Sequence, residues 1–300
     1  MYSFLLPLSG PCNFDHLLTR VSQSSHGAFY RVRESRLGRI LQLSGRPYFV
    51  EVTPTKDAAH WQVLIADGHL GLADQASEQL QHLFALDADL AAFYQHAVGD
   101  PVTAGLVQRL HGARMIRDVG LFSSVINSII SQQLNLAFAA ELKKRLWARC
   151  GTAVAVDDEV FFSDPDPEAV ACLDYDELRT MQYSQRKAEY VIDFSRAVVD
   201  GRFSLERLSV LDDEEAIDYL SSLRGLGRWT AECVLLFGLG RPDLLPAKDV
   251  GLQRAVARFW QLPTRPDEAM LRNWAKVWSP WSSWYTYYLW LGLTLEQSGK

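Results

Sequence analysis

The chain has 300 residues, of which 48% are hydrophobic and 22% charged, and this composition excludes fibrous, intrinsically disordered and disulfide-stapled proteins. Its four cysteines include no C-x-x-C pair, so a zinc knuckle, a cysteine-ligated iron–sulfur cluster and a disulfide framework are excluded as well. The net charge of −6 argues weakly against a nucleic-acid partner, unless the charge is segregated along the chain.

The first hundred residues are predicted to form an antiparallel sheet with one or two helices on a face. Runs of β-branched and aromatic residues predict the strands Tyr2–Leu6, Arg39–Leu43, Tyr48–Thr53 and Trp61–Ile65. Asn13 is placed to cap a helix from Phe14 to about Val21. The charge and aromatic content of residues 1–100 indicate no binding site, so we assign this domain a structural role.

From Ala73 onward the apolar period becomes helical, and residues 101–300 are predicted to form a helical domain. An apolar stripe from Phe122 to Ile130 predicts one helix, which ends at Ser131-Gln132-Gln133. Asn135 is expected to cap a helix to about Arg149 whose outer face carries the basic residues Lys143, Lys144, Arg145 and Arg149. Further helices are expected after the caps Ser184 and Asp212, and from Pro280 as a first helical residue. The predicted fold class is therefore α+β.

All seven histidines lie within the first 111 residues. The helical part therefore predicts neither a Ser-His-Asp triad nor a histidine-ligated metal from its own residues. No apolar run approaches the roughly 20 residues that span a bilayer, and no basic segment follows Met1. We expect a cytoplasmic protein that is neither exported nor attached to a membrane.

The most informative segment runs from Leu223 to Gly240. A helix is expected to end at Leu223, and a short connection containing Gly225 and Gly227 leads into a second helix that begins near Trp229. Glycines in so tight a turn allow positive φ and leave the backbone N–H groups open on one side, which suits a phosphate. Leu226, between the glycines, would pack back against the two helices. When the G-x-G pattern is considered alone, an ordinary turn between two helices, with glycine ending the first helix, is more common than a phosphate-binding hairpin.

A third helix is expected shortly after Lys248 and Asp249, so Asp249 is also a candidate N-cap. Between Leu223 and Trp260 six basic residues face three acidic ones, a net charge of +3 within an acidic chain. We therefore interpret this segment as a basic patch for a nucleic acid.

The combined pattern resembles the helix-hairpin-helix (HhH-GPD) DNA glycosylases, and within them the AlkA-like DNA-3-methyladenine glycosylase II branch. The resemblance rests on L-x-G-x-G-x-x-T-A, G-R-P-D-x-x-P and K-D-V-G in order, together with the upstream Ile129 to Ala140, and covers about residues 105–295. It implies an all-α glycosylase domain with an active-site cleft, preceded by a small sheet domain. It also implies a monomer that acts on double-stranded DNA containing alkylated bases.

The resemblance assigns roles to individual residues. It implies that Asp249 is the catalytic aspartate and that Trp229 and Trp290 line the base pocket. Trp229 occupies the position of the Schiff-base lysine in bifunctional members, so a monofunctional enzyme is implied. The implied DNA-binding residues are Gly225, Leu226, Gly227, Arg228, Thr230, Gln132, Gln133 and Lys248. No metal or other cofactor is expected, apart from a monovalent cation at the hairpin when DNA is bound.

An alkylated purine such as 3-methyladenine or 7-methylguanine carries positive charge, so an electron-rich aromatic wall attracts it and the base leaves without an acid. One ionised carboxylate, Asp249, would stabilise the charge developing on the sugar and orient the attacking water. Two alternatives stay open. One is a related glycosylase for a neutral lesion, hypoxanthine or an oxidised purine, for which the sequence shows no protonating group. The other is a non-catalytic DNA-binding protein that uses the hairpin as a phosphate clamp.

Overall fold

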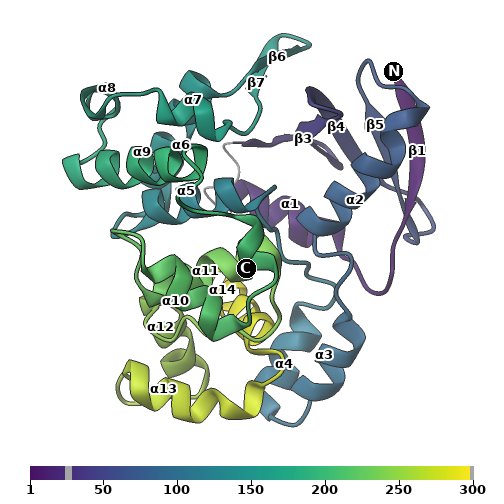
Figure 1. Cartoon of the computed structure of the whole chain (residues 1–300). Coiled ribbons are helices and arrows are strands. Elements are labelled where there is room, and N and C mark those ends of the chain that lie inside the picture. The colour runs from purple at the N-terminus through teal and green to yellow at the C-terminus, as the bar shows by residue number, and fades with distance from the viewer. Residues whose placement is uncertain (24–28, 298–300) are drawn as a thin grey trace.

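The computed structural model describes residues 1–23 and 29–297, which form a sheet domain followed by a helical domain (Figure 1). The strands of the sheet domain are β1 (Tyr2–Pro7), β2 (Arg31–Arg33), β3 (Arg36–Leu43), β4 (Arg46–Pro54) and β5 (His60–Ile65). They form an antiparallel sheet in the order β1-β5-β4-β3-β2. The four predicted strands are present, and β2 is an edge strand that the sequence did not predict.

Two helices, α1 (Phe14–Gln23) and α2 (Ala73–Leu83), pack on this sheet. Asn13 begins α1 as predicted, because its Oδ1 accepts the N–H groups of Asp15 at 3.0 Å and His16 at 3.3 Å. Leu17 and Val21 on α1, together with strand residues such as Val63, are fully buried in the core of the sheet domain. This packing fixes which side of α1 faces the helical domain.

The helical domain is built from short helices around one apolar core. Its α-helices are α3 (Leu90–Ala97), α4 (Pro101–Arg109), α5 (Leu121–Ser131), α6 (Leu136–Cys150), α7 (Pro167–Ala171), α8 (Tyr175–Thr180), α9 (Gln185–Val199), α10 (Asp213–Ser221), α11 (Arg228–Val234), α12 (Val250–Phe259), α13 (Glu268–Trp274) and α14 (Ser282–Gln297). Three short 3-10 helices are described: η2 (Leu70–Leu72), which precedes α2 in the sheet domain, η3 (Glu206–Ser209) and η5 (Ala275–Trp278). The segment η4 (Leu235–Leu239) is a π-helix. A hairpin of β6 (Ala153–Val156) and β7 (Glu159–Phe162) projects toward the sheet domain (Figure 1).

The helix boundaries follow their capping residues. Asn135, Ser184 and Asp212 each accept a backbone N–H at the start of α6, α9 and α10, as predicted, and Asp212 forms a full capping box with Glu215. The expectation for Pro280 was wrong, because α14 begins two residues later, at Ser282. None of the described helices combines the length and the apolar character required to cross a membrane.

Buried arginines tie the two domains together. Arg114, only 1% exposed, donates hydrogen bonds to the carbonyl oxygens of Ser9, Pro11, Ala85 and Ala88 at 2.7–2.9 Å. A guanidinium with so many fixed carbonyl partners holds these loops in one relative position. The sheet domain is therefore anchored firmly enough to contribute to a site on the helical domain.

Candidate active site and hairpin

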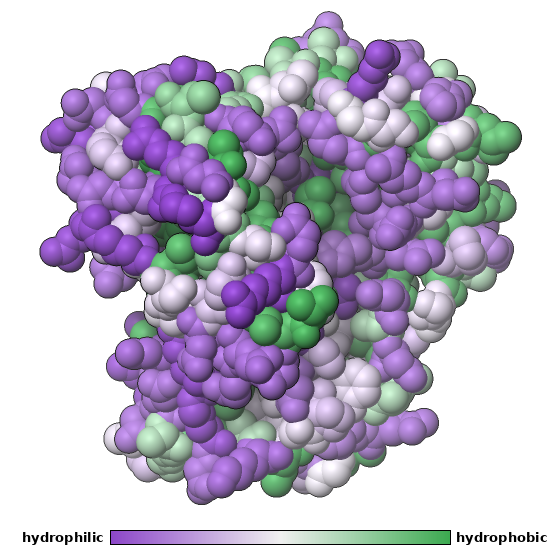
Figure 2. Space-filling model, viewed as in Figure 1, coloured by the Kyte–Doolittle hydropathy of each residue, from purple (hydrophilic) through white to green (hydrophobic). Residues whose placement is uncertain are grey.

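A pocket of about 330 Å³ lies where α1, α5, α6, α11, α12 and α14 approach one another. Figure 2 shows this face of the molecule hollowed between the sheet domain and the lobe of α6 to α9, with apolar residues on the walls of the hollow. Asp249, Trp229 and Trp290, the three residues predicted for catalysis and base binding, all line the pocket. Its volume is at the small end of ligand sites and suits a single nucleobase.

Asp249 is both the N-cap of α12 and a pocket residue. Its Oδ1 accepts the N–H of Leu252 at 2.7 Å and the indole Nε1–H of Trp290 at 2.9 Å. Among the described residues no hydrogen bond is donated to the other oxygen, Oδ2. Two donors on one oxygen hold the carboxylate in a single orientation, and the start of a helix stabilises its negative charge. The carboxylate is therefore fixed, with one oxygen available to a ligand in the pocket.

The glycine of the K-D-V-G motif makes this arrangement sterically feasible. A Cβ at Gly251 would lie 2.9 Å from Oδ1 of Asp249 and 3.4 Å from Nε1 of Trp290. Only a residue without a side chain leaves room for the carboxylate and the indole to meet above the first turn of α12. The spacing of Asp249 and Gly251 in the sequence thus has a direct structural cause.

Aromatic rings form the apolar walls of the pocket. Trp290, on α14, stacks on Phe237 of η4 with ring centroids 6.1 Å apart and planes inclined by 13°. Trp229 lies at the start of α11, and its Nε1 is buried without a hydrogen-bond partner among the described residues. Phe237 was not predicted as a pocket residue, since it belongs to an apolar run typical of core; the π-helix there is a local signal that only the structure reveals.

Part of the lining is polar and was also not predicted. It contains Asp118, which precedes α5, Asn127 on α5 and Lys143 on α6. Burial raises the pKa of Asp118, and the nearby Lys143 ammonium opposes that rise. Burial lowers the pKa of Lys143 to about 8, although Asp118 favours its charged form. The expectation that Lys143 lies on the outer face of its helix was wrong, because it is only 2% exposed.

The sheet domain reaches the pocket through Arg20 on α1. The guanidinium carbon of Arg20 lies 5.9 Å from the ring centroid of Tyr287 on α14. Besides the structural role expected of it, this domain thus contributes one side chain to the lining of the pocket. The helix that carries Arg20 was predicted, but its orientation toward α14 depends on the packing between the domains.

The predicted hairpin is the connection between α10 and α11. Gly225 has φ 91°, and a Cβ there would lie 2.3 Å from the ring of Tyr190, so glycine is required on both grounds. Gly227 differs from the prediction: its φ of −97° is accessible to any residue, and a Cβ there would meet no atom within 4 Å. It begins α11 on the open side of the turn. Leu226 is 4% exposed and packs in the helical core, so only its backbone can contact a ligand.

A second hollow adjoins the hairpin and shares Trp229 with the pocket. The other predicted DNA-binding residues that line it are Gln132, Gln133, Gly225, Gly227, Arg228, Thr230 and Lys248. The structure therefore brings together side chains from three separate segments of the chain, as the resemblance implied. The shared indole makes the hairpin hollow and the pocket neighbours.

Gln132 and Gln133 have different environments at the end of α5. Nε2 of Gln132 donates to the carbonyl oxygen of Gly225 at 2.9 Å and to Oγ1 of Thr230 at 3.1 Å. Gln133 is exposed and has φ 55°, in the left-handed region. Gln132 therefore joins α5 to the hairpin, whereas Gln133 is presented to the solvent.

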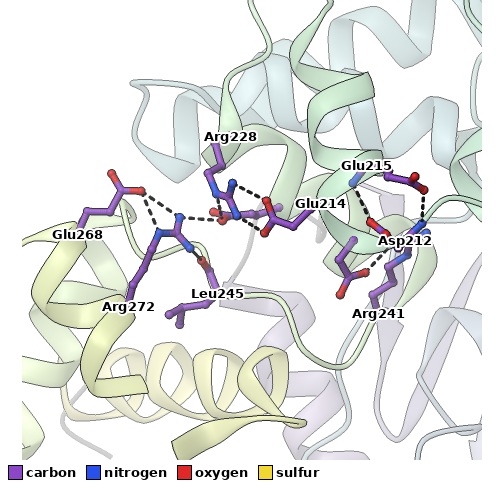
Figure 3. A network of polar contacts seen from close by, with 10 residues as sticks. Asp212, Glu214, Glu215, Arg228, Arg241, Leu245, Glu268 and Arg272 are labelled. Atoms are coloured by element: carbon purple, nitrogen blue, oxygen red, sulfur yellow. Dashed lines mark hydrogen bonds and ion pairs between the residues drawn. The ribbon is translucent and has the colours of Figure 1, made fainter. Parts of the chain in front are cut away.

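The interpretation of the segment from Leu223 to Trp260 as a basic patch needs correction. Four of its arginines form ion pairs with acids, three of them only with acids from outside the segment. The pairs are Arg224 with Glu189, Arg228 with Glu214 and Glu232, Arg241 with Asp213, and Arg258 with Glu296. Figure 3 shows Arg228 in such a network, beside the pair of Arg272 with Glu268. A charge count along the sequence misses these partners, because they come from distant elements.

Glu232 is the buried centre of this network. It is 1% exposed and accepts hydrogen bonds from Arg228 at 3.0 Å and from Arg272 at 2.8 Å. Burial raises its pKa, and the two arginines oppose that rise. The network joins α11 to α13 directly behind the hairpin. Within residues 1–23 and 29–297, no group of three or more His, Cys, Asp or Glu side chains is arranged to hold a metal ion.

Comparisons with known proteins agree with this geometry. Residues 126–280 match the family model of the HhH-GPD superfamily base excision DNA repair proteins, and residues 3–119 match the AlkA N-terminal domain. The YfjP protein of Bacillus subtilis (strain 168) is 33% identical over 293 residues, which are 97% of this chain and 99% of the relative. A DNA-3-methyladenine glycosylase of the same organism is 30% identical over 217 residues, 72% of each chain.

Solved structures show the same fold. The 3-methyladenine DNA-glycosylase from Archaeoglobus fulgidus superposes with a TM-score of 0.84 and 24% identity, covering 97% of this chain and 98% of its own. The Clostridium acetobutylicum 8-oxoguanine glycosylase/lyase superposes with a TM-score of 0.79 and 16% identity, covering 97% and 96%.

A sheet domain, a helical hairpin and a carboxylate pocket beside it define a DNA-binding base excision repair protein. The chain belongs to the HhH-GPD superfamily and carries an AlkA N-terminal domain, which makes it a DNA glycosylase of the AlkA type. The predicted α+β fold class and the predicted family are thereby confirmed.

Proposed function

We propose that the chain is a monofunctional DNA glycosylase that removes alkylated purines, including 3-methyladenine and 7-methylguanine, and leaves an abasic site. The observation that carries this proposal is the Asp249 carboxylate, fixed by two hydrogen bonds inside a pocket with indole walls. A base inside a duplex cannot reach such a pocket, so the nucleotide must first rotate out of the helix.

The chemistry follows from the carboxylate. As the N-glycosidic bond breaks, its electron pair leaves with the cationic base, and positive charge develops on the deoxyribose. The ionised Asp249 stabilises this charge, and its Oδ2 orients the water that adds to the sugar carbon. Because an alkylated purine becomes neutral as it departs, no acid is required for this step.

Base selection would come from the aromatic walls. Trp229 and Trp290 present electron-rich rings to a cationic base, and each favourable cation–π contact contributes about 0.5–2 kcal/mol. Since ~1.4 kcal/mol corresponds to a tenfold preference, two such walls give about a hundredfold at most. The lability of the alkylated bond supplies the remaining selectivity.

The hairpin would hold the DNA backbone. In this proposal the N–H groups of Gly225, Gly227 and Arg228 bind a phosphate, whereas that of Leu226 donates to the carbonyl oxygen of Leu223 within the turn. Lys248 and Thr230 lie beside the phosphate. Gln132 positions the hairpin, and Gln133 is the residue presented toward the duplex. The backbone carbonyl oxygens of the turn are hard donors that fit a monovalent cation bridging to the phosphate.

Trp229 supports a monofunctional reaction. An indole occupies the position where an amine would form a covalent imine with the sugar, so hydrolysis by water is the route left to this site. Borohydride should therefore trap no covalent enzyme–DNA adduct. A trapped adduct would contradict the monofunctional proposal. We further propose that the enzyme is a cytoplasmic monomer bound to the nucleoid, which size-exclusion chromatography alone and with a short duplex tests.

The decisive experiment is Asp249→Asn. We expect release of methylated bases from duplex DNA to fall by two to three orders of magnitude, which is roughly the loss seen when a transition-state electrostatic contact is removed. Binding to the methylated duplex should persist, since the carboxylate does not contact phosphate in this proposal. Near-wild-type release would refute the mechanism.

Asp267→Asn is the matched control. Asp267 also caps a helix, with its side chain accepting the N–H of Met270 at 2.8 Å, but it does not line the pocket. The same chemical change at an N-cap outside the pocket should leave base release unchanged. This comparison separates loss of catalysis from loss of a helix cap.

A further inference from the structure

A hollow of about 540 Å³ lies apart from the pocket and the hairpin, and we call it the aromatic hollow. It is formed by the turn between α3 and α4, the ends of α12 and α13, η5 and the start of α14. Among the described residues, none that lines it also lines the pocket or the hairpin hollow. Figure 1 shows α3, α4 and α13 together at the lower end of the molecule, away from the lobe of α6 to α9.

Aromatic rings form the walls of the aromatic hollow. Trp260 caps the end of α12, Trp274 ends α13, Trp278 belongs to η5 and Tyr285 to α14. Ring centroids are 5.7 Å apart for Trp260 and Trp274, 6.1 Å for Trp260 and Trp278, and 5.3 Å for Trp278 and Tyr285. Trp274 is nevertheless 38% exposed, so an indole at the edge of this cluster is open to a ligand. The negative face of an indole attracts a cation.

Asp100 adds a carboxylate to this lining. It is the N-cap of α4, and its Oδ1 accepts the N–H groups of Val102 at 2.8 Å and Thr103 at 3.1 Å. Its Oδ2 accepts the indole Nε1–H of Trp260 at 3.3 Å. The cap and the indole fix the carboxylate in one orientation, and Oδ2, with one long hydrogen bond, keeps capacity for a further donor.

The charge of Asp100 is not balanced within the hollow. Among the described residues, no lysine or arginine lines the hollow or forms an ion pair with Asp100. His96, the one basic residue in the described part of the lining, has its Nδ1 2.8 Å from the hydroxyl oxygen of Tyr285. Burial, followed by the charge of Asp100, raises the pKa of Tyr285 to about 12. The hollow therefore combines electron-rich rings with an uncompensated carboxylate.

We propose that the aromatic hollow binds the guanidinium group of an arginine on a partner protein. A guanidinium is planar and weakly hydrated, so it can stack on an indole while its N–H groups donate to a carboxylate. Trp274 supplies the open indole, and Oδ2 of Asp100 supplies the acceptor. A quaternary ammonium has no N–H group and would leave this acceptor unused.

The rim of the hollow favours an arginine that is part of a polypeptide. Val277 lines the hollow and is 72% exposed, and Val98, next to the lining residue Gly99, is 62% exposed. Residues on either side of a bound arginine would cover these apolar side chains, whereas a free cation would leave them in water. A partner bound here leaves the pocket and the hairpin open to DNA. The inference therefore goes beyond the proposed function and does not depend on it.

The test uses the full chain and two pentapeptides, acetyl-Ala-Val-Arg-Val-Ala-amide and its counterpart with citrulline, which has the shape of arginine without the charge. The arginine peptide should shift the indole N–H signals of Trp260 and Trp274 in NMR spectra. The citrulline peptide should bind about tenfold more weakly or less, as expected when a charged hydrogen bond and a cation–π contact are lost. Acetyl-arginine-amide, the free cation, should bind more weakly than the arginine peptide.

Asp100→Asn removes the charge and keeps the helix cap, because asparagine caps as well as aspartate. It should weaken the arginine peptide about tenfold and leave the citrulline peptide unchanged. Trp274→Leu should weaken the arginine peptide too. Asp89→Asn is the matched control: Asp89 caps α3, accepting the N–H of Ala92 at 3.0 Å, but does not line the hollow. It should bind like the wild type.

Three outcomes overturn the inference. Equal affinities for the arginine and citrulline peptides, or no binding at millimolar concentrations, show that the hollow does not recognise the cation. An arginine peptide that binds Asp100→Asn and Trp274→Leu as tightly as the wild type lies elsewhere. Acetyl-arginine-amide that binds as tightly as the peptide refutes the partner protein. Base release from methylated DNA should be the same in Asp100→Asn and the wild type, so failure of the proposed function would be a separate result.

Discussion

Gly251→Ala tests whether the position of the Asp249 carboxylate limits the reaction. The added Cβ would lie 2.9 Å from Oδ1 of Asp249, whereas carbon–oxygen contacts normally begin at about 3.3 Å. The carboxylate or the start of α12 must therefore shift by roughly half an ångström. Such a shift lengthens the bonds from Leu252 at 2.7 Å and from Trp290 at 2.9 Å beyond good hydrogen-bond geometry.

The expected loss can be worked from these contacts. A hydrogen bond to a charged group contributes about 1.5–3 kcal/mol, so losing one from the catalytic carboxylate should slow base release about tenfold to a hundredfold. Stability should change little, because alanine has a higher helix propensity than glycine by about 1 kcal/mol and this offsets part of the strain. Single-turnover release from methylated duplex DNA and urea unfolding measure the two quantities separately.

Gly105→Ala is the matched control for this substitution. Gly105 lies in α4, and a Cβ there would meet no atom within 4 Å. We expect this variant to gain up to about 1 kcal/mol in unfolding free energy and to keep the wild-type rate. If Gly251→Ala also keeps the wild-type rate, the close contact of carboxylate and indole is irrelevant to the reaction, and the reasoning is refuted.

Two further predictions concern the hairpin. Gly225→Ala places a Cβ at a residue with φ 91° and 2.3 Å from the ring of Tyr190. The free energy of unfolding in urea should therefore fall by roughly 1–3 kcal/mol or more, and duplex binding should weaken. Unchanged stability would mean that the turn relaxes freely. Lys248→Gln should weaken binding equally for methylated and unmethylated duplexes and lower the slope of log affinity against log salt by about one, as removal of a single phosphate contact does. A Lys248 effect confined to methylated DNA would place this side chain at the base instead.

The parts of the structure that depend on local chemistry were predictable from the sequence. Asn13, Ser184 and Asp212 cap their helices because a short polar side chain satisfies the first N–H groups whatever packs nearby. Gly225 is required by its own backbone angle. Asp249 was identified through the family resemblance of the K-D-V-G motif, and the structure adds the steric reason for that motif, the close approach at Gly251.

The residues that were missed depend on contacts between distant segments. Lys143 lies next to three other basic residues on a helix with few acids, so nothing along α6 distinguishes the buried lysine from the exposed ones. Its burial is decided by the approach of Asp118 and α5. Arg20 is similar, because α1 was predicted but its contact with α14 requires the anchoring of one domain on the other.

Gln132 connects the hairpin to α5, the helix that lines the pocket. Its amide bridges Gly225 and Thr230 across the hairpin, while its own carbonyl oxygen accepts a hydrogen bond from Nζ of Lys187 at 2.8 Å. The same amine also holds the carbonyl oxygens of Ile129 and Ile130 at the end of α5. If the hairpin binds phosphate as proposed, these hydrogen bonds connect that contact directly to α5, which lines the pocket. Rotation of a nucleotide out of the duplex costs a few kcal/mol, and contacts of the hairpin with the DNA backbone would offset this cost in the proposed reaction.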